Sequence, residues 1–402
     1  MIVKKFIKVT RDTWIIFGIA LLIFVAIEAG FSLAFYARGI WHTPYVDFRI
    51  MADAYADNSW VPQYFREHDQ LGNPRWRSYS YWRRPPYSGN HININHDGIR
   101  KTSNPIAPEG TEPAAKVFMF GGSTMFGSGE RDDFTIPSIF AKEARNRNIN
   151  CEVVNFGQEA YVSTQEVIEL MLQLQKGNIP DLVIFYDGAN DTHTASQMHA
   201  AGLPFNEFKR EKEFNLSEKR ELIPLAFQSA VNGLSTIRFF NGLLKGFEIR
   251  RDSARFDHPL EYEKPISDKA ALALAVVETY LNNIQLAHAL SKFYGFECLF
   301  YWQPIIDQKQ PLTEYERKVL EFDPNHTSIK DLYGETYAFL QSRSAGLKGK
   351  INLHDLGQIF NGVREPIFID YVHLGERGNT LVARKIVEDV AQLLELKRTV
   401  NL

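Results

Sequence analysis

Apolar residues follow two different patterns along most of this chain. After residue 114, short runs rich in Val, Ile, Phe and Tyr have the length and composition of buried parallel strands. Longer stretches with helical periodicity lie between them. The pattern predicts strands near 116–120, 151–156, 181–186, 297–302 and 351–356, and helices near 135–148, 163–178, 269–295, 328–346 and 376–398.

Strands that alternate with helices predict an α/β fold, a doubly wound parallel five-stranded sheet with right-handed crossovers. Ligands of such sheets bind outside the carboxyl ends of the strands, so residues at these ends are the first candidates for a site. The alternation is interrupted at about 193–264 by a charged stretch and then an apolar one. We interpret this insertion as a lid over the site, as a membrane-lying element, or as a solvated loop with a helical hairpin.

One continuous apolar stretch precedes this pattern. Residues 14–36 can cross a hydrocarbon layer of about 30 Å as a helix, and only Glu28 interrupts them. Their apolar side chains favour insertion by about 4 to 8 kcal/mol together, against about 3 kcal/mol for one central carboxylate. We expect a transmembrane helix rather than a cleaved signal peptide, because the run exceeds the usual length and no clean cleavage site follows.

Basic residues around this stretch predict its orientation. More of them precede it than follow it closely, so the positive-inside rule places residues 1–13 in the cytoplasm. Everything after about residue 40 then lies outside the inner membrane of a bacterium, in the periplasm or at the cell surface. The residues concerned are Lys4, Lys5, Lys8 and Arg11 before the stretch and Arg38 after it.

Residues 38–112 are rich in aromatic residues and arginine and have neither period. We expect an extended juxtamembrane segment that wraps onto the domain formed by residues 114–397. Its densest cluster could bind sugar rings or lipid headgroups. Packing against the core, with the charges reaching water, is the favoured interpretation. The cluster consists of Tyr79, Tyr81, Trp82, Arg83, Arg84 and Tyr87.

Composition narrows the function further. The chain has 402 residues and a net charge of -3, so nothing in its bulk charge indicates a nucleic-acid partner. Its two cysteines, Cys151 and Cys298, begin strands that the expected sheet order separates by two others. At about 4.8 Å per strand that separation exceeds the reach of a disulfide, so we expect two buried free thiols.

Several strand ends carry the residue types that acyl transfer requires. Ser123 follows the first strand, Gly157 the second and Asn190 the third, while Asp370 and His373 precede the last helix. A serine hydroxyl becomes a nucleophile when an imidazole takes its proton and a carboxylate orients that imidazole. The backbone N–H groups of Ser123 and Gly157 and the amide of Asn190 are candidate oxyanion donors. A GGST turn alone is more typical of a helix cap, but the order of these segments makes the set specific.

The segments FGGST, NFGQEAY, DGAND and DYVHL resemble the four blocks of the SGNH (GDSL-like) hydrolase superfamily. The resemblance implies a flavodoxin-like sheet, Ser123 as nucleophile, and a triad completed by His373 and Asp370. Gly122 stands where the family typically has aspartate, which loosens the match of the first block. The implied activity is that of a membrane-anchored serine esterase acting on acyl esters, typically O-acetyl esters, of extracytoplasmic carbohydrate.

Two other functions fit the same sequence. A carbohydrate O-acetyltransferase would use the same triad, and a catalytically inactive protein that binds or assembles envelope polysaccharide would fit Gly122 and the aromatic segment. His193, shortly after the GAND turn, is interpreted as a surface-loop residue rather than a substrate contact. The remaining histidines lack metal-ligand spacing, so we expect neither a metal nor a cofactor.

Overall fold

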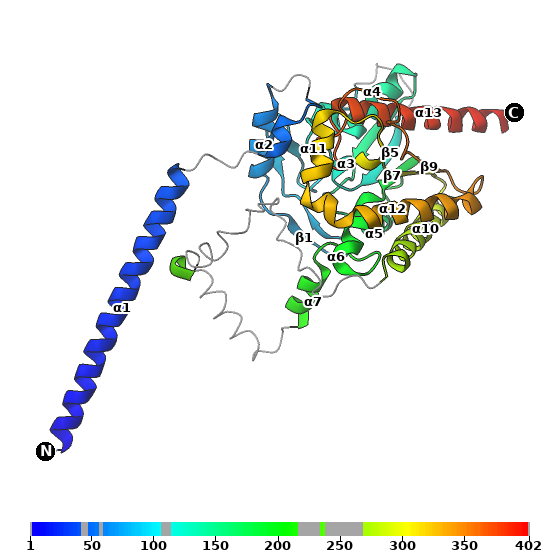
Figure 1. Cartoon of the computed structure of the whole chain (residues 1–402). Coiled ribbons are helices and arrows are strands. Elements are labelled where there is room, and N and C mark those ends of the chain that lie inside the picture. Colours follow the sequence, from blue (N-terminus) through cyan, green and yellow to red (C-terminus); the bar gives the residue numbers. More distant parts are fainter. Residues whose placement is uncertain are drawn as a thin grey trace. The chain divides into compact units, whose positions relative to one another are not determined.

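A computed structural model of the chain describes residues 2–41, 47–55, 59–105, 114–215, 234–237 and 268–400. The chain divides into two compact units, which are described separately. The smaller comprises Met1–Val46 and Lys209–Ala254, and the larger comprises Asp47–Phe208 and Arg255–Leu402. The larger unit contains the sheet (Figure 1), and its residue ranges include every predicted site residue.

The larger unit is built on a five-stranded parallel sheet with the order β6-β5-β7-β8-β9. The strands are β5 (Ala115–Gly121), β6 (Cys151–Asn155), β7 (Leu182–Asp187), β8 (Glu297–Trp302) and β9 (Leu353–Asp355). The second strand in sequence lies outside the first, which makes the sheet doubly wound with a flavodoxin-like order. The predicted fold and all the predicted strands are confirmed.

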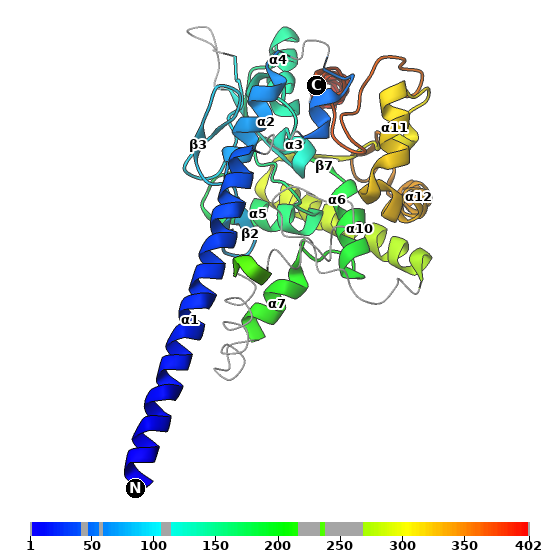
Figure 2. The same cartoon turned by 60° about the vertical axis from the view of Figure 1, so that its left-hand side comes forward.

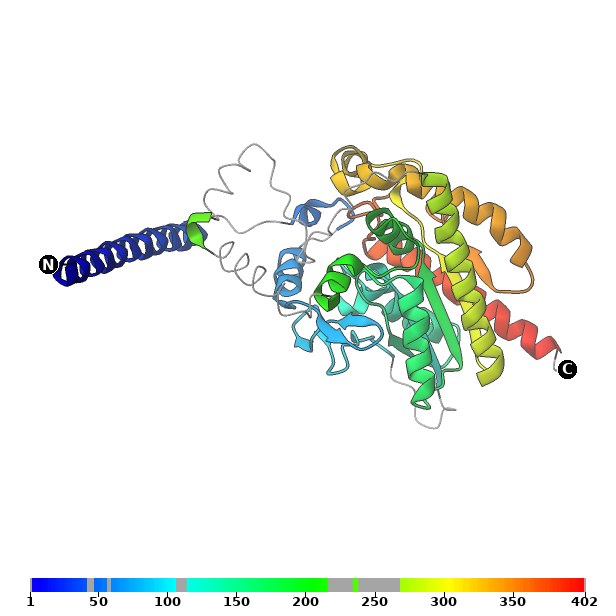
Figure 3. The ribbon, with the colours of Figure 1, turned by 90° about the horizontal axis from the view of Figure 1, so that it is seen from below.

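Helices cover both faces of this sheet. On one face lie α4 (Ile136–Asn146) and α13 (Glu376–Val400), which pack against each other. On the other face lie α5 (Ser163–Gln175) and α10 (Lys269–Tyr294). The helix α12 (Pro324–Ser344) packs alongside α10 (Figures 2 and 3). The central strands are buried on both faces, which explains their unbroken apolar runs.

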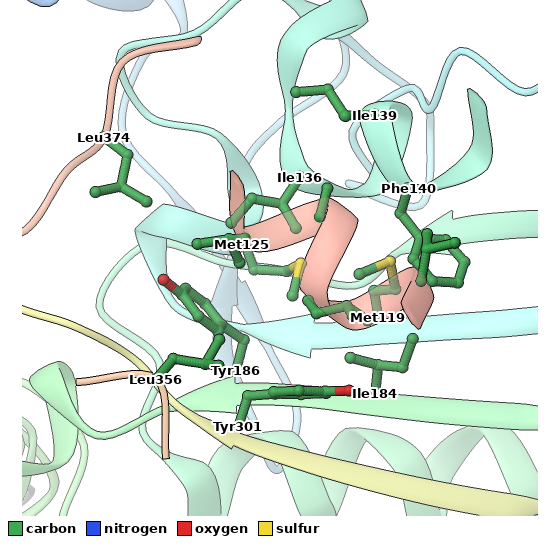
Figure 4. Close-up of a cluster of buried hydrophobic side chains, with 14 of the residues drawn as sticks. Met119, Met125, Ile136, Ile139, Phe140, Ile184, Tyr186, Tyr301, Leu356 and Leu374 are labelled. Carbon is green, nitrogen blue, oxygen red and sulfur yellow. The ribbon is translucent and has the colours of Figure 1, made fainter. Parts of the chain in front are cut away.

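Alternate residues of each strand enter two separate cores. Met119, Ile184 and Tyr186 point toward α4 and α13, where Figure 4 shows them packed against Met125 and Phe140. On the opposite face a row of phenylalanine rings crosses the sheet, with neighbouring centroids 4.9 to 5.3 Å apart. Such aromatic pairs add about 0.5 to 1.5 kcal/mol each beyond the area they bury. The row consists of Phe156, Phe120, Phe185 and Phe300.

Three helices differ from the pattern-based prediction. Helix α6 (Ala189–Met198) continues through the predicted start of the insertion at residue 193, and α7 (Glu207–Asn215) follows it. Helix α11 (Glu314–Phe322) was not predicted, and it begins at a capping box of Thr313 and Glu316. Most of the insertion, residues 216–233 and 238–267, lies outside the described residues. Its interpretation as a lid or membrane-lying element stays a prediction.

The juxtamembrane segment is folded rather than extended. It contains η1 (Phe48–Met51), α2 (Val61–Gln70) and two short antiparallel hairpins. The hairpins pair β1 (Arg75–Arg77) with β2 (Tyr81–Arg83) and β3 (Tyr87–Ser88) with β4 (Asn93–Ile94). Residues of α2, of β4 and of the loops beside them form a buried cluster with Phe126 and Ile369 of the main domain, whereas Trp82 of β2 packs separately with Tyr161 and Phe205.

Within the aromatic and arginine cluster, Trp82, Arg83 and Arg84 are buried, while Tyr79 is 73% exposed. Packing against the core is therefore confirmed for the first three. The arginine charges do not reach water as expected, because buried carboxylates pair with them. Arg83 lies 2.8 Å from Glu169, and Arg84 donates to Glu159.

Arg100 joins the juxtamembrane segment to the turn that follows β5. Its guanidinium is fully buried and donates through Nη1 to the carbonyls of Phe126 and Gly127, at 3.0 and 2.6 Å. It also donates through Nη2 to the carbonyl of Glu130, and its Nε lies 3.0 Å from the carboxylate of Asp132. A buried charge is tolerated only when it is paired and hydrogen-bonded in this way.

The smaller unit contains α1 (Ile2–Trp41), in which Thr10–Ala34 is long and apolar enough to cross a membrane. Glu28, the charge within this stretch, accepts hydrogen bonds from the backbone N–H groups of Ser235 and Thr236, at 2.7 and 2.9 Å. The hydroxyl of Ser32 lies 2.7 Å from that of Ser235. The carboxylate is thus hydrogen-bonded to the insertion within its own unit.

Both cysteines are free and buried, as predicted. Cys151 lies on β6 and Cys298 on β8, with β5 and β7 between them. Burial raises the pKa of the Cys151 thiol to about 11. Since the thiolate is the reactive form, Cys151 is unreactive at neutral pH.

Replacing Arg100 with Met should lower the free energy of unfolding by about 3 to 5 kcal/mol, because Asp132 and the carbonyls lose a buried partner. Urea unfolding of the full-length chain in detergent, followed by tryptophan fluorescence, measures this change. Arg147→Met is the control, since Arg147 pairs with Glu388 at the surface with side-chain exposures of 41% and 47%. Equal stability losses in the two variants would contradict the role of Arg100.

Candidate active site

The predicted nucleophile stands at a sharp turn at the carboxyl end of β5. Ser123 is the first residue of the short helix α3 (Ser123–Phe126), which Gly127 ends in the left-handed region with a φ of 92°. At the first helical position the backbone N–H has no acceptor within the helix. Both the hydroxyl and the backbone N–H of Ser123 are therefore available at the strand end.

Three side chains form a continuous hydrogen-bonded relay at this turn. The Oγ atom of Ser123 lies 2.7 Å from Nε2 of His373, and Nδ1 of His373 lies 2.7 Å from Oδ2 of Asp370. The other oxygen of Asp370 accepts the backbone N–H groups of Val372 and His373, at 3.0 and 2.7 Å. The carboxylate is thus fixed by its own loop, and it fixes the imidazole with Nε2 toward the serine.

Asp370 is buried but ionised. Burial alone would raise the pKa of this carboxyl, but His373 and Arg49, together with the hydrogen bonds from His373, hold it well below its usual range. Nη1 of Arg49 lies 3.7 Å from Oδ2 of Asp370. Arg49 belongs to the juxtamembrane segment, and nothing in the sequence pattern indicated that it reaches the site.

Asn190 approaches the nucleophile turn from the end of β7. Its Nδ2 donates to the carbonyl of Tyr161 at 2.8 Å, which leaves a second amide hydrogen for another acceptor. A Cβ atom on Gly122 would lie only 2.1 Å from this Nδ2. Gly122, the departure from the usual block, is therefore the residue that lets the amide of Asn190 lie against the turn carrying Ser123.

Gly157 lies close to the turn, but its backbone N–H has a different partner from the predicted one. Its backbone N–H, expected to face the oxyanion, donates instead to Oδ1 of Asn155 at 2.9 Å. A Cβ atom at this position would lie 2.4 Å from the backbone nitrogen of Phe126. Glycine is thus required for close packing of the second strand end on α3, and the described geometry gives its N–H an internal acceptor.

Glu159, which lies in the same sequence block as Gly157, binds the turn that carries Ser123. Its carboxylate accepts from Ser128 Oγ at 3.1 Å and lies 3.0 Å from Nε2 of His68. Burial would raise the pKa of Glu159, but Arg84 and His68 hold it well below the usual range. This ionic group ties the juxtamembrane segment to the nucleophile turn a second time.

The interpretation of His193 as a surface-loop residue is wrong. His193 lies in α6, one helical turn after Asn190. Its Nδ1 lies 3.1 Å from the hydroxyl of Tyr371, the neighbour of Asp370, and its Nε2 lies 2.8 Å from Nε2 of Gln197. Burial lowers the pKa of His193 to about 4, so the ring is neutral at physiological pH.

No family model matches the chain, and no curated protein matches it. Among solved structures it is similar to an acetylxylan esterase from Geobacillus stearothermophilus, with 12% identity, 69% of this chain and 94% of that chain covered, and a TM-score of 0.34. It is also similar to a member of the lipolytic protein G-D-S-L family from Veillonella parvula, with 14% identity, coverages of 68% and 97%, and a TM-score of 0.33. A third similar structure is the acetyl xylan esterase AlAXEase, with 13% identity, coverages of 68% and 99%, and a TM-score of 0.30.

The architecture can be described from this chain alone, by the order of the strands in the sheet and by the strand ends at which the four sequence blocks lie. The fold is a doubly wound, flavodoxin-like parallel α/β sheet. Ser123 follows β5, Gly157 follows β6, Asn190 follows β7, and the loop of Asp370 and His373 precedes α13. Within the described ranges, no group of three or more His, Cys, Asp or Glu side chains is arranged to hold a metal ion.

Gly122→Ala should lower the rate of Ser123 acylation about as much as Asn190→Ala, roughly 10²-fold, because the new methyl group displaces the Asn190 amide. The double variant should lose little more than either single variant, since both remove the same donor. Acylation rates measured with an activated acetyl ester test this cycle. Fully additive losses would show that Gly122 acts independently of Asn190.

His193 should make the protein sensitive to acid. Its folded pKa of about 4 lies below the ordinary 6.5, so the unfolded chain binds the proton first and stability falls as pH drops below 6.5. The loss attributable to His193 should be about 2 kcal/mol at pH 5. His193→Gln should flatten the dependence of stability on pH between 6.5 and 5, as urea unfolding at each pH would reveal. An unchanged pH dependence in this variant would contradict a half-buried, neutral His193.

Proposed function

We propose that this protein is a serine esterase of the SGNH type that acts on acyl esters, with O-acetyl esters of extracytoplasmic carbohydrate as the substrate class. One observation carries the proposal. Ser123, His373 and Asp370 form a relay with both of its hydrogen bonds at 2.7 Å, at the carboxyl edge of a doubly wound sheet. The relay has the order and orientation that activate a serine hydroxyl.

The reaction follows from these positions. Oγ of Ser123 attacks the ester carbonyl while its proton passes to Nε2 of His373, and Asp370 stabilises the imidazolium that forms. The oxyanion accepts hydrogen bonds from the backbone N–H of Ser123 and from the second amide hydrogen of Asn190. His373 then protonates the departing alcohol and activates water to release the acyl group. Gly157 supports this arrangement by its close packing on α3 and is left out of the proposed donor set.

The cellular location is part of the proposal. The stretch Thr10–Ala34 supports a membrane-spanning helix, and its large apolar side chains are exposed. The excess of basic residues before this stretch supports a catalytic domain outside the cytoplasm. Acylated envelope carbohydrate is one class of ester substrate on that side of a bacterial inner membrane.

The alternative of an inactive binding protein loses its main support. Gly122 was its strongest sequence feature, and the close approach of the Asn190 amide gives that glycine a place in an assembled site. The aromatic and arginine cluster was its second feature, and three of its residues are engaged in the core.

Transfer of an acetyl group to a sugar hydroxyl would use the same relay, with the sugar in place of water. The two reactions are separated by the acceptor. Acetyl release from an activated donor should proceed in buffer alone for a hydrolase. A requirement for added polysaccharide, with acetate appearing on the glycan, would instead identify a transferase.

A fluorophosphonate probe should label the full-length chain in detergent at Ser123, and labelling should be lost in Ser123→Ala and fall at least about 10³-fold in His373→Ala. Peptide mass spectrometry identifies the labelled residue. Ser342→Ala, which changes an exposed serine on α12, is the control and should keep the label. A well-folded wild type that stays unlabelled would overturn the proposed function.

A further inference from the structure

The triad acid has a charged neighbour that the reaction scheme above does not use. The short helix η1 begins at Asp47, whose carboxylate accepts the backbone N–H of Arg49 at 3.0 Å. The same carboxylate binds the guanidinium of Arg49 through Nε and Nη2, at 3.0 and 2.6 Å. The remaining guanidinium nitrogen, Nη1, faces Oδ2 of Asp370 at 3.7 Å.

That oxygen of Asp370 is the one that accepts from Nδ1 of His373. Asp47, Arg49, Asp370 and His373 therefore form one row in which negative and positive groups alternate. The row is shielded from water, with side-chain exposures of 18%, 13%, 8% and 14% in that order. The ring of Phe65 lies 5.1 Å from the guanidinium carbon and closes one side. Charges in such surroundings interact more strongly than charges at the surface.

Within the part of the chain that the structure describes, Asp370 also acts on four tyrosines, which are neutral at physiological pH. Burial raises the pKa of each above its ordinary value. The charge that His373 experiences from this side is therefore set by Asp370, Arg49 and Asp47. The tyrosines are Tyr55, Tyr315, Tyr333 and Tyr371, and carboxylates farther out that act on them include Asp53, Asp307 and Asp323.

During acylation His373 becomes an imidazolium, which the carboxylate of Asp370 stabilises. An uncompensated guanidinium beside that carboxylate would oppose the new positive charge. We propose that Arg49 is a positioning residue that holds Oδ2 of Asp370, and that Asp47 cancels its charge so that His373 meets the full effect of the carboxylate. This inference rests on the proposed function. It makes the juxtamembrane segment part of the catalytic apparatus.

The test measures the rate at which a fluorophosphonate probe labels Ser123 of the full-length chain in detergent, as a function of pH. Asp47→Asn leaves Arg49 uncompensated, so the acid limb of the profile should move to lower pH by about one unit and the plateau rate should fall about tenfold. Arg49→Gln removes the positive charge, so the limb should move to higher pH by a similar amount. In the double variant the side chains at positions 47 and 49 are both neutral, so their net charge is zero as in wild type. Its acid limb should therefore return close to that of wild type.

Arg49→Lys keeps the charge and should leave the limb near its original pH. Arg384→Gln and Glu143→Gln, which break an ion pair of 2.8 Å between α13 and α4, are controls that should not move the limb. Shifts of Asp47→Asn and Arg49→Gln in the same direction, or no shift in either, would overturn the inference. If Arg49→Gln does not fold, Asp47→Asn decides alone, since an unmoved limb contradicts the proposal. Absence of labelling in wild type would instead overturn the proposed function itself.

Discussion

The fully buried guanidinium of Arg100 is the constraint on which the turn carrying Ser123 depends. It donates hydrogen bonds to the carbonyls of Phe126, Gly127 and Glu130 and pairs with Asp132. Moving either the guanidinium or these acceptors away would leave unpaired polar groups in the interior. Arg100 belongs to the juxtamembrane segment, whereas its acceptors follow Ser123 in the sequence. The segment between the apolar helix and the sheet is thus a structural component of the site.

The close packing of buried groups also explains why position 122 is glycine, where the first block of the SGNH superfamily typically has aspartate. In this chain the amide of Asn190 occupies the space that a side chain at position 122 would need, so glycine there and asparagine at 190 form a matched pair. The close packing of Gly157 on the backbone of α3 is a second contact of this kind. Both glycines are required by the approach of other groups, and neither has a positive φ.

Much of the fold could be predicted because its signals are local. The central strands are buried on both faces and therefore read as continuous apolar runs, and the relay residues could be found because strand ends converge at one edge of a doubly wound sheet. The contacts of Arg49 with Asp370 and of Arg100 with Gly127 could not be predicted. They join distant parts of the sequence through irregular segments that have no periodicity. The sequence predicted that the N–H of Gly157 faces the oxyanion, but in the structure it donates to the side chain of Asn155. That contact depends on a local turn that residue types alone do not specify.

The most direct test of this account is a crystal structure of the protein after reaction with a phosphonate ester that mimics the tetrahedral intermediate. The account predicts a covalent bond to Oγ of Ser123. It also predicts that the phosphonyl oxygen lies within about 3.1 Å of the Ser123 backbone nitrogen and of Nδ2 of Asn190. Nε2 of His373 should stay within hydrogen-bonding distance of the esterified oxygen. An adduct on another residue, or a phosphonyl oxygen that contacts neither donor, would contradict the central claim that these strand ends form an acyl-transfer site.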